Sequence, residues 1–360
     1  MNRFLTRVVL LVALLGGPHD SGFCQEEIGI SVPPFSGELG NNVGTVLWLK
    51  VWRTLIIPSQ KGAPSAAMWW KREPYREDES FQQVEDDVKN TGIRIVLWGN
   101  TIKFGDDVLA QPLLCIIPQR DEKFGGDDPL TWIVRIQTEE SSLKLEVTIP
   151  QTRYQLPPIL LNNNLLSLYS DVHSVKIYAG RKNAPTVHGL GRPVADLGWD
   201  FEAKHNEGDF TQVSYKGGLG WIYLPKLQGD ITVVDYVAGV IRLFRSDYRR
   251  AIDVLKKSAA SGNDSPLKVD SLLLQALATA KLKGDPGPLI ESAEKLNPYL
   301  QTTAKFKILC LISQIEAGTT KDKQGAISAL AREIAVKEYL FAPGDQWLST
   351  AREILAVLRR

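Results

Sequence analysis

The chain has 360 residues, of which 44% are hydrophobic and 23% are charged, and its formal net charge is +1. This length exceeds what one ordinary hydrophobic core supports, so we expect two or three domains. The composition is that of a globular protein. The near-zero net charge is evidence against a protein that binds nucleic acid through a basic surface.

The amino terminus predicts a secretory signal peptide over residues 1–24. Arg3 and Arg7 precede the apolar run 8–15, which is too short to span a bilayer, and the helix-breaking sequence 16–18 follows it. We therefore expect an exported protein, periplasmic or secreted, with no transmembrane segment in its mature form.

Cleavage after Cys24 places small residues, Gly22 and Cys24, at both recognition positions. A lipid on Cys24 is the less favoured reading, because Ser21 and Phe23 do not fit the lipoprotein pattern. The two remaining cysteines, Cys115 and Cys310, lie in apolar runs, which favours buried, inert thiols over a disulfide.

Residues 27–165 predict an α/β domain with a mixed sheet. Ser80 and Gln83 form a capping box that starts a helix ending near Gly92. Periodicity and turn residues predict the other elements: strands 28–32, 93–98 and 108–117, a helix over 39–57, a kink at 99–100, and a hairpin of 132–136 with 143–149.

The loop predicted over 58–78 contains two adjacent tryptophans, Trp69 and Trp70. They could form an exposed recognition patch for a partner. Packing of both rings against their own domain is the favoured alternative, because large aromatic side chains are usually buried.

The order of these elements resembles the amino-terminal α/β domain of TolB-type and curli-secretion-type envelope proteins over residues 27–117. The resemblance rests on 28–35 with its Pro-Phe ending, on the helix from Gly40 to Leu55, and on Val96-Leu97-Trp98-Gly99 before Gly105-Asp106. It implies an envelope protein, and as one alternative a structural subunit of a secretion complex.

Residues 166–228 predict a small β-barrel. Strands are expected at 174–178 and 201–203, and a closing hairpin at 210–224 turns at Gly217 and Gly218. Gly220 leaves room for close backbone approach beside a large ring.

This arrangement resembles the bacterial SH3-like (SH3b) domain over about 168–228. The matching residues are Ile177-Tyr178, Gly189-Leu190, Phe201-Glu202-Ala203, Gly208-Asp209-Phe210, Gln212-Val213 and Gly220-Trp221-Ile222. Phe210 stands where the family more often has Trp, and 192–200 looks like an insertion. The resemblance implies binding of a cell-wall peptide or a protein.

The candidate ligand-binding residues of this barrel are its rings: Tyr178, Phe210, Tyr215, Trp221 and Tyr223. A barrel this small needs large aromatic side chains to fill its core whether or not it binds anything. The sequence leaves both roles open and favours the core for each ring.

Residues 229–360 predict an all-α helical array. Helices are expected near 233–244, 248–255, 267–282, 288–296, 302–317, 322–340 and 347–358. The array resembles degenerate tetratricopeptide-like repeats over 232–360, on the evidence of Ala251 with Leu255, the Gly284-Asp285 turn and the helix closing at Asn297-Pro298. This implies a concave face for protein partners.

Arg242, Arg245 and Arg249 recur at helical spacing. They could form a basic stripe for an acidic partner, whereas a solvated helix face is the favoured alternative.

The residue pattern gives no catalytic constellation, so we expect neither an enzyme nor a cofactor. His173, His188 and His205 lack the spacing of metal ligands, which favours exposed loop histidines and no metal. A Cys/His or Ser/His site also lacks its motif.

The sequence therefore favours a non-enzymatic binding or scaffolding protein of the bacterial cell envelope. A carboxylate-based cell-wall hydrolase targeted by the SH3-like domain stays open as an alternative.

Overall fold

The computed structural model describes residues 28–55, 66–69, 73–76, 79–117, 129–137, 142–149, 153–181, 192–198, 201–225, 232–260, 266–318 and 322–360. The expected signal peptide, including Cys24, lies outside these ranges. The chain divides into two compact units, each made of two segments: residues 1–117 with 152–241, and residues 118–151 with 242–360. Within the described ranges, no helix has both the length and the apolar character needed to cross a membrane.

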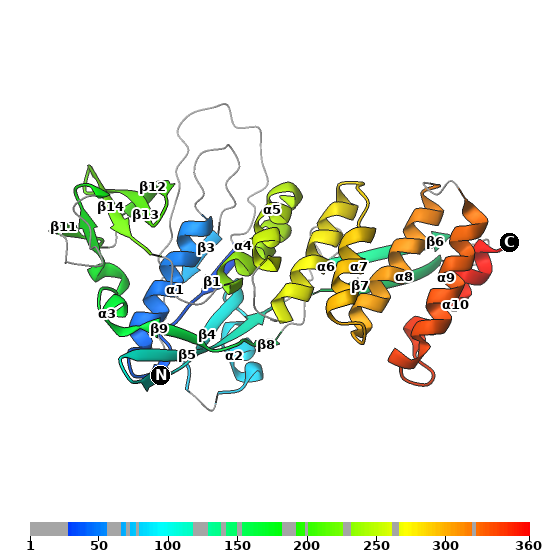
Figure 1. Cartoon of the computed structure of the whole chain (residues 1–360), viewed down its shortest axis with the longest axis horizontal. Coiled ribbons are helices and arrows are strands. Elements are labelled where there is room, and N and C mark those ends of the chain that lie inside the picture. The colour runs from blue at the N-terminus through cyan, green and yellow to red at the C-terminus, as the bar shows by residue number, and fades with distance from the viewer. Residues whose placement is uncertain are drawn as a thin grey trace. The chain divides into compact units, whose positions relative to one another are not determined.

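A mixed seven-stranded sheet forms the centre of the first unit (Figure 1). Its first strand runs parallel to β3 and β4, and β4 turns at Gly105 into the antiparallel β5, which also pairs with β8 and β9. The strands are β1 (Ile28–Ser31), β2 (Ser36–Gly37), β3 (Ala66–Trp69), β4 (Ile93–Phe104), β5 (Asp107–Ile116), β8 (Arg153–Gln155) and β9 (Ile159–Asn162). The predicted mixture of strands and helices is confirmed.

Two details of this sheet differ from the prediction. The expected loop 58–78 contains β3, whose Trp69 pairs with Ser31 of β1. The expected kink at Gly99 is absent, and β4 continues to Phe104. Gly99 instead makes room for a neighbour, because a Cβ there would lie 2.6 Å from the ring of Phe35.

Two helices cover this sheet. Nearly every residue of α1 (Gly40–Leu55) is buried, and a Cβ on Gly44 would meet the Pro33 carbonyl at 2.6 Å, so the helix lies tight against the chain that leads into it. The shorter α2 (Phe81–Val88) begins with the predicted capping box. It packs Val84 and Val88 into a core cluster with Trp98 and Cys115.

A second sheet in the first unit has five strands in the order β11-β10-β14-β13-β12, and every pair is antiparallel. The strands are β10 (Lys176–Tyr178), β11 (Pro193–Asp196), β12 (Phe201–Glu207), β13 (Phe210–Tyr215) and β14 (Gly218–Tyr223). The predicted hairpin is confirmed, whereas the expected insertion 192–200 contributes β11. The turn expected at Gly189 lies outside the described residues.

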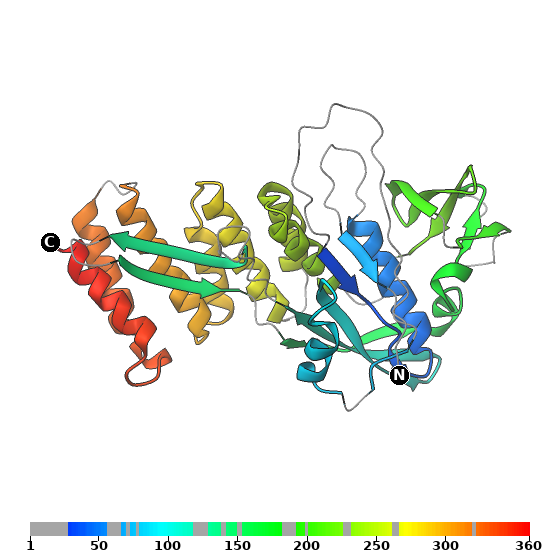
Figure 2. The same ribbon diagram turned by 180° about the vertical axis from the view of Figure 1, so that it is seen from behind.

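The five-stranded sheet is attached to α1, which it lies beside in Figures 1 and 2. The ring of Trp52 meets that of Phe201 edge-on, with centroids 5.2 Å apart. Polar contacts flank the rings, because Lys50 donates to the carbonyl of Pro225 and Arg53 to those of Gly208 and Leu224. The polar side chains of α1 therefore serve as anchors for this sheet.

Helices that contact one another in chain order make up most of the second unit. They are α5 (Tyr248–Ala259), α6 (Pro266–Lys281), α7 (Gly287–Leu296), α8 (Gln301–Glu316), α9 (Lys323–Lys337) and α10 (Gln346–Leu358), and α4 (Thr232–Phe244) precedes them. The predicted helices are confirmed.

A hairpin from the middle of the chain belongs to this helical unit. Its strands are β6 (Thr131–Gln137) and β7 (Ser142–Thr148), and they contact α8 and α10. Figure 2 shows the hairpin lying along the helices. The alternating residues Trp132, Val134, Ile136, Leu145 and Val147 are buried, and Trp132 meets Phe306 edge-on at 5.4 Å.

The position of this hairpin differs from the expected domain over 27–165. The alternating pattern predicts a hairpin with one apolar face, but two sets of residues distant in sequence could cover that face. In the structure the helices of 242–360 cover it.

Candidate functional site

The hairpin of β13 and β14 has one buried face and one open face. Val213 lies opposite Gly220 and Thr211 opposite Ile222, and all four are buried. The alternate positions, Gln212 opposite Trp221 and Phe210 opposite Tyr223, are half-buried. Because side chains alternate across a strand, the buried set faces the core and the second set faces outward.

An apolar row runs along β14 on this outward side. Leu219, Trp221 and Tyr223 are spaced two residues apart, and the side chain of Leu219 is 60% exposed. Phe210 adds a fourth member, since its ring centroid lies 5.2 Å from that of Tyr223. We call these four residues the aromatic face.

Two of the five predicted ligand residues are not part of the aromatic face. Tyr215 shares the opposite side of β13 with Val213, and a Cβ on Gly220 would lie 3.0 Å from its ring and 2.2 Å from Ile177. Gly220 therefore lies close to Ile177 and to the ring of Tyr215. Tyr178 is only 5% exposed.

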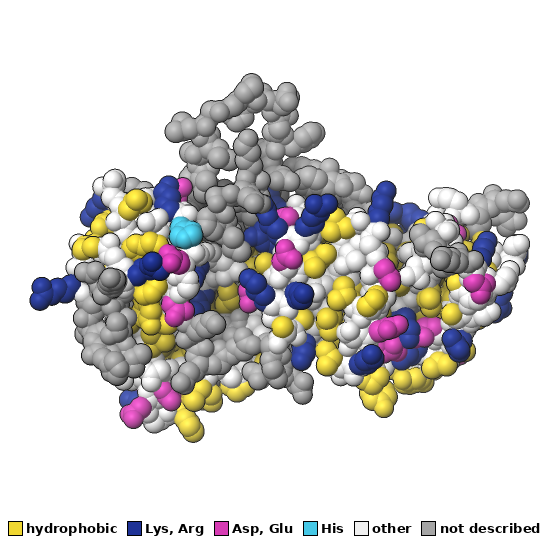
Figure 3. All heavy atoms as spheres, turned by 45° about the horizontal axis from the view of Figure 1, so that its top comes forward, with side chains coloured by type: hydrophobic (Ala, Val, Ile, Leu, Met, Phe, Trp, Pro, Cys, Tyr) yellow, Lys and Arg dark blue, Asp and Glu magenta, His cyan; other side chains and the backbone are white. Residues whose placement is uncertain are grey.

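Charged and polar groups border Trp221. The guanidinium carbon of Arg181 lies 5.5 Å from the Trp221 centroid, and the same guanidinium forms an ion pair with Glu207. The imidazole of His205 meets the indole edge-on at 6.4 Å. In Figure 3, hydrophobic side chains lie beside basic, acidic and histidine side chains on the part of the first unit that carries this sheet.

The tyrosine hydroxyls at this site stay protonated at neutral pH. Burial raises the pKa of Tyr178, and burial together with the Asp209 carboxylate raises the pKa of Tyr223. Tyr169, buried behind them, donates a hydrogen bond to the carbonyl of Tyr223 and has its pKa raised chiefly by burial. The face therefore offers neutral aromatic surface bordered by the Arg181–Glu207 pair and by the Asp209 carboxylate.

The described histidines do not form a metal site. His173 is half-buried and its Nδ1 lies 2.7 Å from the carbonyl of Gly198, whereas His205 is exposed on β12. Neither is the exposed loop residue that we expected, and His188 lies outside the described ranges. Across the described part of the chain, no three His, Cys, Asp or Glu side chains are grouped as metal ligands.

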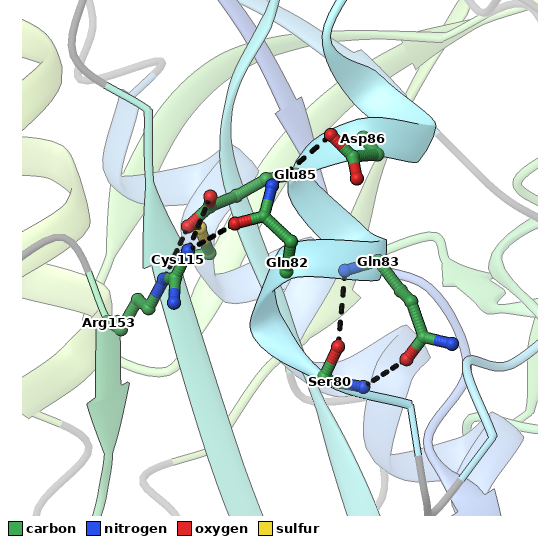
Figure 4. A network of polar contacts seen from close by, with 7 residues as sticks. All are labelled: Ser80, Gln82, Gln83, Glu85, Asp86, Cys115 and Arg153. Carbon is green, nitrogen blue, oxygen red and sulfur yellow. Dashed lines mark hydrogen bonds and ion pairs between the residues drawn. The ribbon is translucent and has the colours of Figure 1, made fainter.

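A polar network connects α2 to the first sheet (Figure 4). Arg153 of β8 binds both carboxylate oxygens of Glu85, at 2.7 and 2.8 Å, and also Gln82 at 2.9 Å. Its guanidinium lowers the pKa of Glu85. The Cys115 thiol lies 3.5 Å from Glu85, and burial raises its pKa to about 12. A thiol held protonated beside a carboxylate is a poor nucleophile, so this network secures α2 rather than performing chemistry.

The three arginines predicted as a basic stripe do not form an exposed patch. Arg242 is 2% exposed and pairs with Asp247 at 3.0 Å, and burial lowers its pKa. Arg245 is half-buried, which leaves Arg249 as the exposed member. The three residues do not share one helix, because α4 ends at Phe244 and α5 begins at Tyr248. The second predicted partner surface was the pair of adjacent tryptophans. Trp69 belongs to strand β3, and Trp70 lies outside the described residues.

The sequence predicted three of the four residues of the aromatic face, which are Phe210, Trp221 and Tyr223. It did not indicate the fourth, Leu219, or the neighbouring Arg181, His205 and Glu207. Leu219 could have been found, because it continues the two-residue spacing of Trp221 and Tyr223. The other three come from β12 and from the chain after β10, so only the strand register brings them to Trp221.

The chain was compared with protein-family models, with curated proteins and with solved structures, and none of them matches. Arguments about function therefore rest on the residues themselves.

Proposed function

We propose that this chain is an exported, non-enzymatic binding or scaffolding protein of the bacterial cell envelope, and that the aromatic face of its five-stranded sheet binds a peptide. The observation that carries the proposal is the row of Leu219, Trp221 and Tyr223 on the outward side of β14. Two half-buried aromatic rings in a row with an exposed leucine leave apolar surface in contact with water, which is typical of binding surfaces.

The topology of this sheet supports an SH3-like module. Consecutive strands pair as 10–11, 12–13 and 13–14, and the first strand also pairs with the last. One further pairing, between β11 and β12, would close this order of strands into a small barrel, and this supports the proposed SH3-like module.

The helices are proposed to bind a protein at the turns rather than on the face that β6 and β7 cover. Leu296 ends α7 and Tyr299 follows it, whereas Val336 lies in the last turn of α9 and Tyr339 just after that helix, and each is between 43% and 74% exposed. The side-chain amide of Gln301 donates to the Leu340 carbonyl, which places the two turns side by side.

Binding to purified cell wall tests the proposal for the aromatic face. The mature chain is mixed with insoluble peptidoglycan that carries its peptide stems, and separately with glycan from which the peptides have been removed. Trp221→Ala should weaken sedimentation with the first material at least fivefold. Tyr299→Ala, which removes an exposed aromatic ring from a helical turn, is the matched control and should bind as the wild type does.

Equal binding by folded Trp221→Ala and wild type contradicts a role for the aromatic face. Binding to bare glycan shows that the ligand is a sugar rather than a peptide. Release of soluble glycan fragments by the wild type shows that the chain is an enzyme.

A further inference from the structure

We propose that Trp221 and Glu207 form a subsite for one basic side chain, arginine or lysine, of an extended peptide, and that Arg181 occupies this subsite in the free protein. The inference rests on the proposed peptide-binding function and adds the chemistry of the ligand.

The internal contact shows what this part of the sheet accepts. A guanidinium lies 5.5 Å from the centroid of the indole, and its charge is neutralised by the Glu207 carboxylate. Tryptophan is the ring that attracts cations most strongly. A carboxylate beside an outward-facing tryptophan is therefore a preformed receptor for a cation, whichever chain supplies that cation.

Arg181 can leave this receptor at low cost. Its side chain is 48% exposed and that of Glu207 is 46% exposed, so water solvates both groups once they separate. Exposed ion pairs of this kind contribute little to stability. Trp221 and Glu207 lie within paired strands, whereas Arg181 lies beyond the end of β10 at Tyr178.

The charges favour a cationic ligand over an anionic one. A ligand carboxylate that approached Arg181 would also approach Glu207 and would break the contact between Arg181 and the indole. A ligand guanidinium or ammonium replaces both contacts of Arg181 and releases that side chain to water. The imidazole edge of His205 and the protonated Tyr223 hydroxyl add no negative charge that would change this balance.

The row on β14 also sets the spacing of the ligand. Leu219, Trp221 and Tyr223 recur every two residues, which is about 7 Å along a strand. An extended peptide lying along this row places side chains of one side at the same interval. The preferred ligand therefore has an apolar residue two positions before or after its basic residue.

Calorimetric titration of the mature chain with blocked hexapeptides tests this inference. The first peptide is acetyl-Gly-Leu-Gly-Arg-Gly-Leu-amide, and two others carry citrulline or glutamate in place of the arginine. Citrulline preserves the shape of arginine and removes its charge. We expect the arginine peptide to bind most tightly, and Trp221→Ala and Glu207→Gln each to weaken it about three- to tenfold.

Arg181→Gln gives the deciding result, because it removes the internal competitor. It should tighten binding of the arginine peptide by roughly threefold or more. Lys176→Gln is the matched control, since Lys176 is another exposed base of the same sheet and pairs with Asp196 instead of Glu207. This control should change nothing.

Weaker binding by Arg181→Gln, or tighter binding of the glutamate peptide, overturns the inference and makes Arg181 an anion receptor. The inference is also overturned if none of the three peptides binds to the wild type or to Arg181→Gln. The peptide-binding function survives either result if Trp221→Ala still loses sedimentation with peptidoglycan that carries its peptide stems.

Discussion

The indole N–H of Trp347 donates a hydrogen bond of 2.9 Å to the backbone carbonyl of Glu146, which lies 201 positions earlier in the chain. The same indole stacks on Phe341, with centroids 5.8 Å apart, and Lys305 lies within 6 Å of both rings. The last helix of the chain is therefore joined to β7, and the β6–β7 hairpin is part of the core of the helical unit.

Substitution of Trp132 should destabilise the helices, although Trp132 lies outside their sequence. Trp132→Ala removes a ring that is 7% exposed and contacts Phe306 of α8. We expect a loss of about 3 kcal/mol in the free energy of unfolding, measured by urea titration with helical circular dichroism as the signal. Ile133→Ala, on the other side of β6, is the control and should cost clearly less. Equal losses for the two variants contradict the position of the hairpin.

Gly220 should tolerate no side chain, whereas Gly218 should. A Cβ on Gly220 would lie 2.2 Å from the Ile177 side chain, but the nearest atom to a Cβ on Gly218 is 3.6 Å away. We expect Gly220→Ala to lower the melting temperature of the first unit, with a cost of about 1–3 kcal/mol, and Gly218→Ala to be nearly neutral. A neutral Gly220→Ala disproves the close packing of β14 on β10.

Both cysteines should be unreactive in the folded protein. Cys115 and Cys310 are buried and unpaired, and burial raises the pKa of each thiol to about 12. The thiolate is the reactive form, so labelling by iodoacetamide at pH 8 should be slow until urea unfolds the chain. Mass spectrometry of the two cysteine peptides measures this. Rapid labelling of either one in native buffer contradicts the structure at that residue.

Lys50 should make stability depend on pH in the alkaline range. Burial, with a smaller contribution from Arg53, lowers the pKa of Lys50 from 10.5 to about 8. Between these values the unfolded chain binds more protons than the folded chain, so the free energy of unfolding contributed by this group rises with pH. The rise is on the order of 3 kcal/mol.

A variant without this amine should lack the rise. We expect the stability of Lys50→Met, relative to wild type, to fall between pH 7.5 and 10.5 when both are unfolded with urea. Lys103→Met is the control, because Lys103 is exposed and pairs with Glu38 on the surface. A constant difference between wild type and Lys50→Met across this range disproves the burial of the charge.

Local rules were sufficient for most elements of this fold. The capping box of Ser80 and Gln83, the turn at Gly105 and the helix breaks near Pro286 and Pro298 depend on neighbours within a few residues, and the structure has each of them. One exception is β3, a four-residue strand whose pairing with β1 depends on a parallel register that no local pattern specifies.

The candidate site was predictable only in part. Which side of a strand faces the core depends on the register of its pairing with a neighbouring strand, and the sequence does not give that register. The alternation of Trp221 and Tyr223 shows that they share a side, and so do Val213 and Tyr215. Which pair faces the core depends on Gln212 lying opposite Trp221, a relationship between two strands. The position of the β6–β7 hairpin was not predictable for a similar reason, since an apolar hairpin does not encode which helices will cover it.

The insertion of β6 and β7 between β5 and β8 has a consequence for folding during synthesis on the ribosome. About 150 residues separate the end of β7 from the start of α8, which covers it. At roughly 5–20 residues per second, the ribosome needs on the order of ten seconds to make them. During that interval Trp132, Val134 and Leu145 have emerged before their partners exist. A nascent chain that is stalled or truncated within this interval exposes the apolar side chains of the hairpin and is prone to aggregate. The helices that are synthesised last therefore bury side chains that were made much earlier.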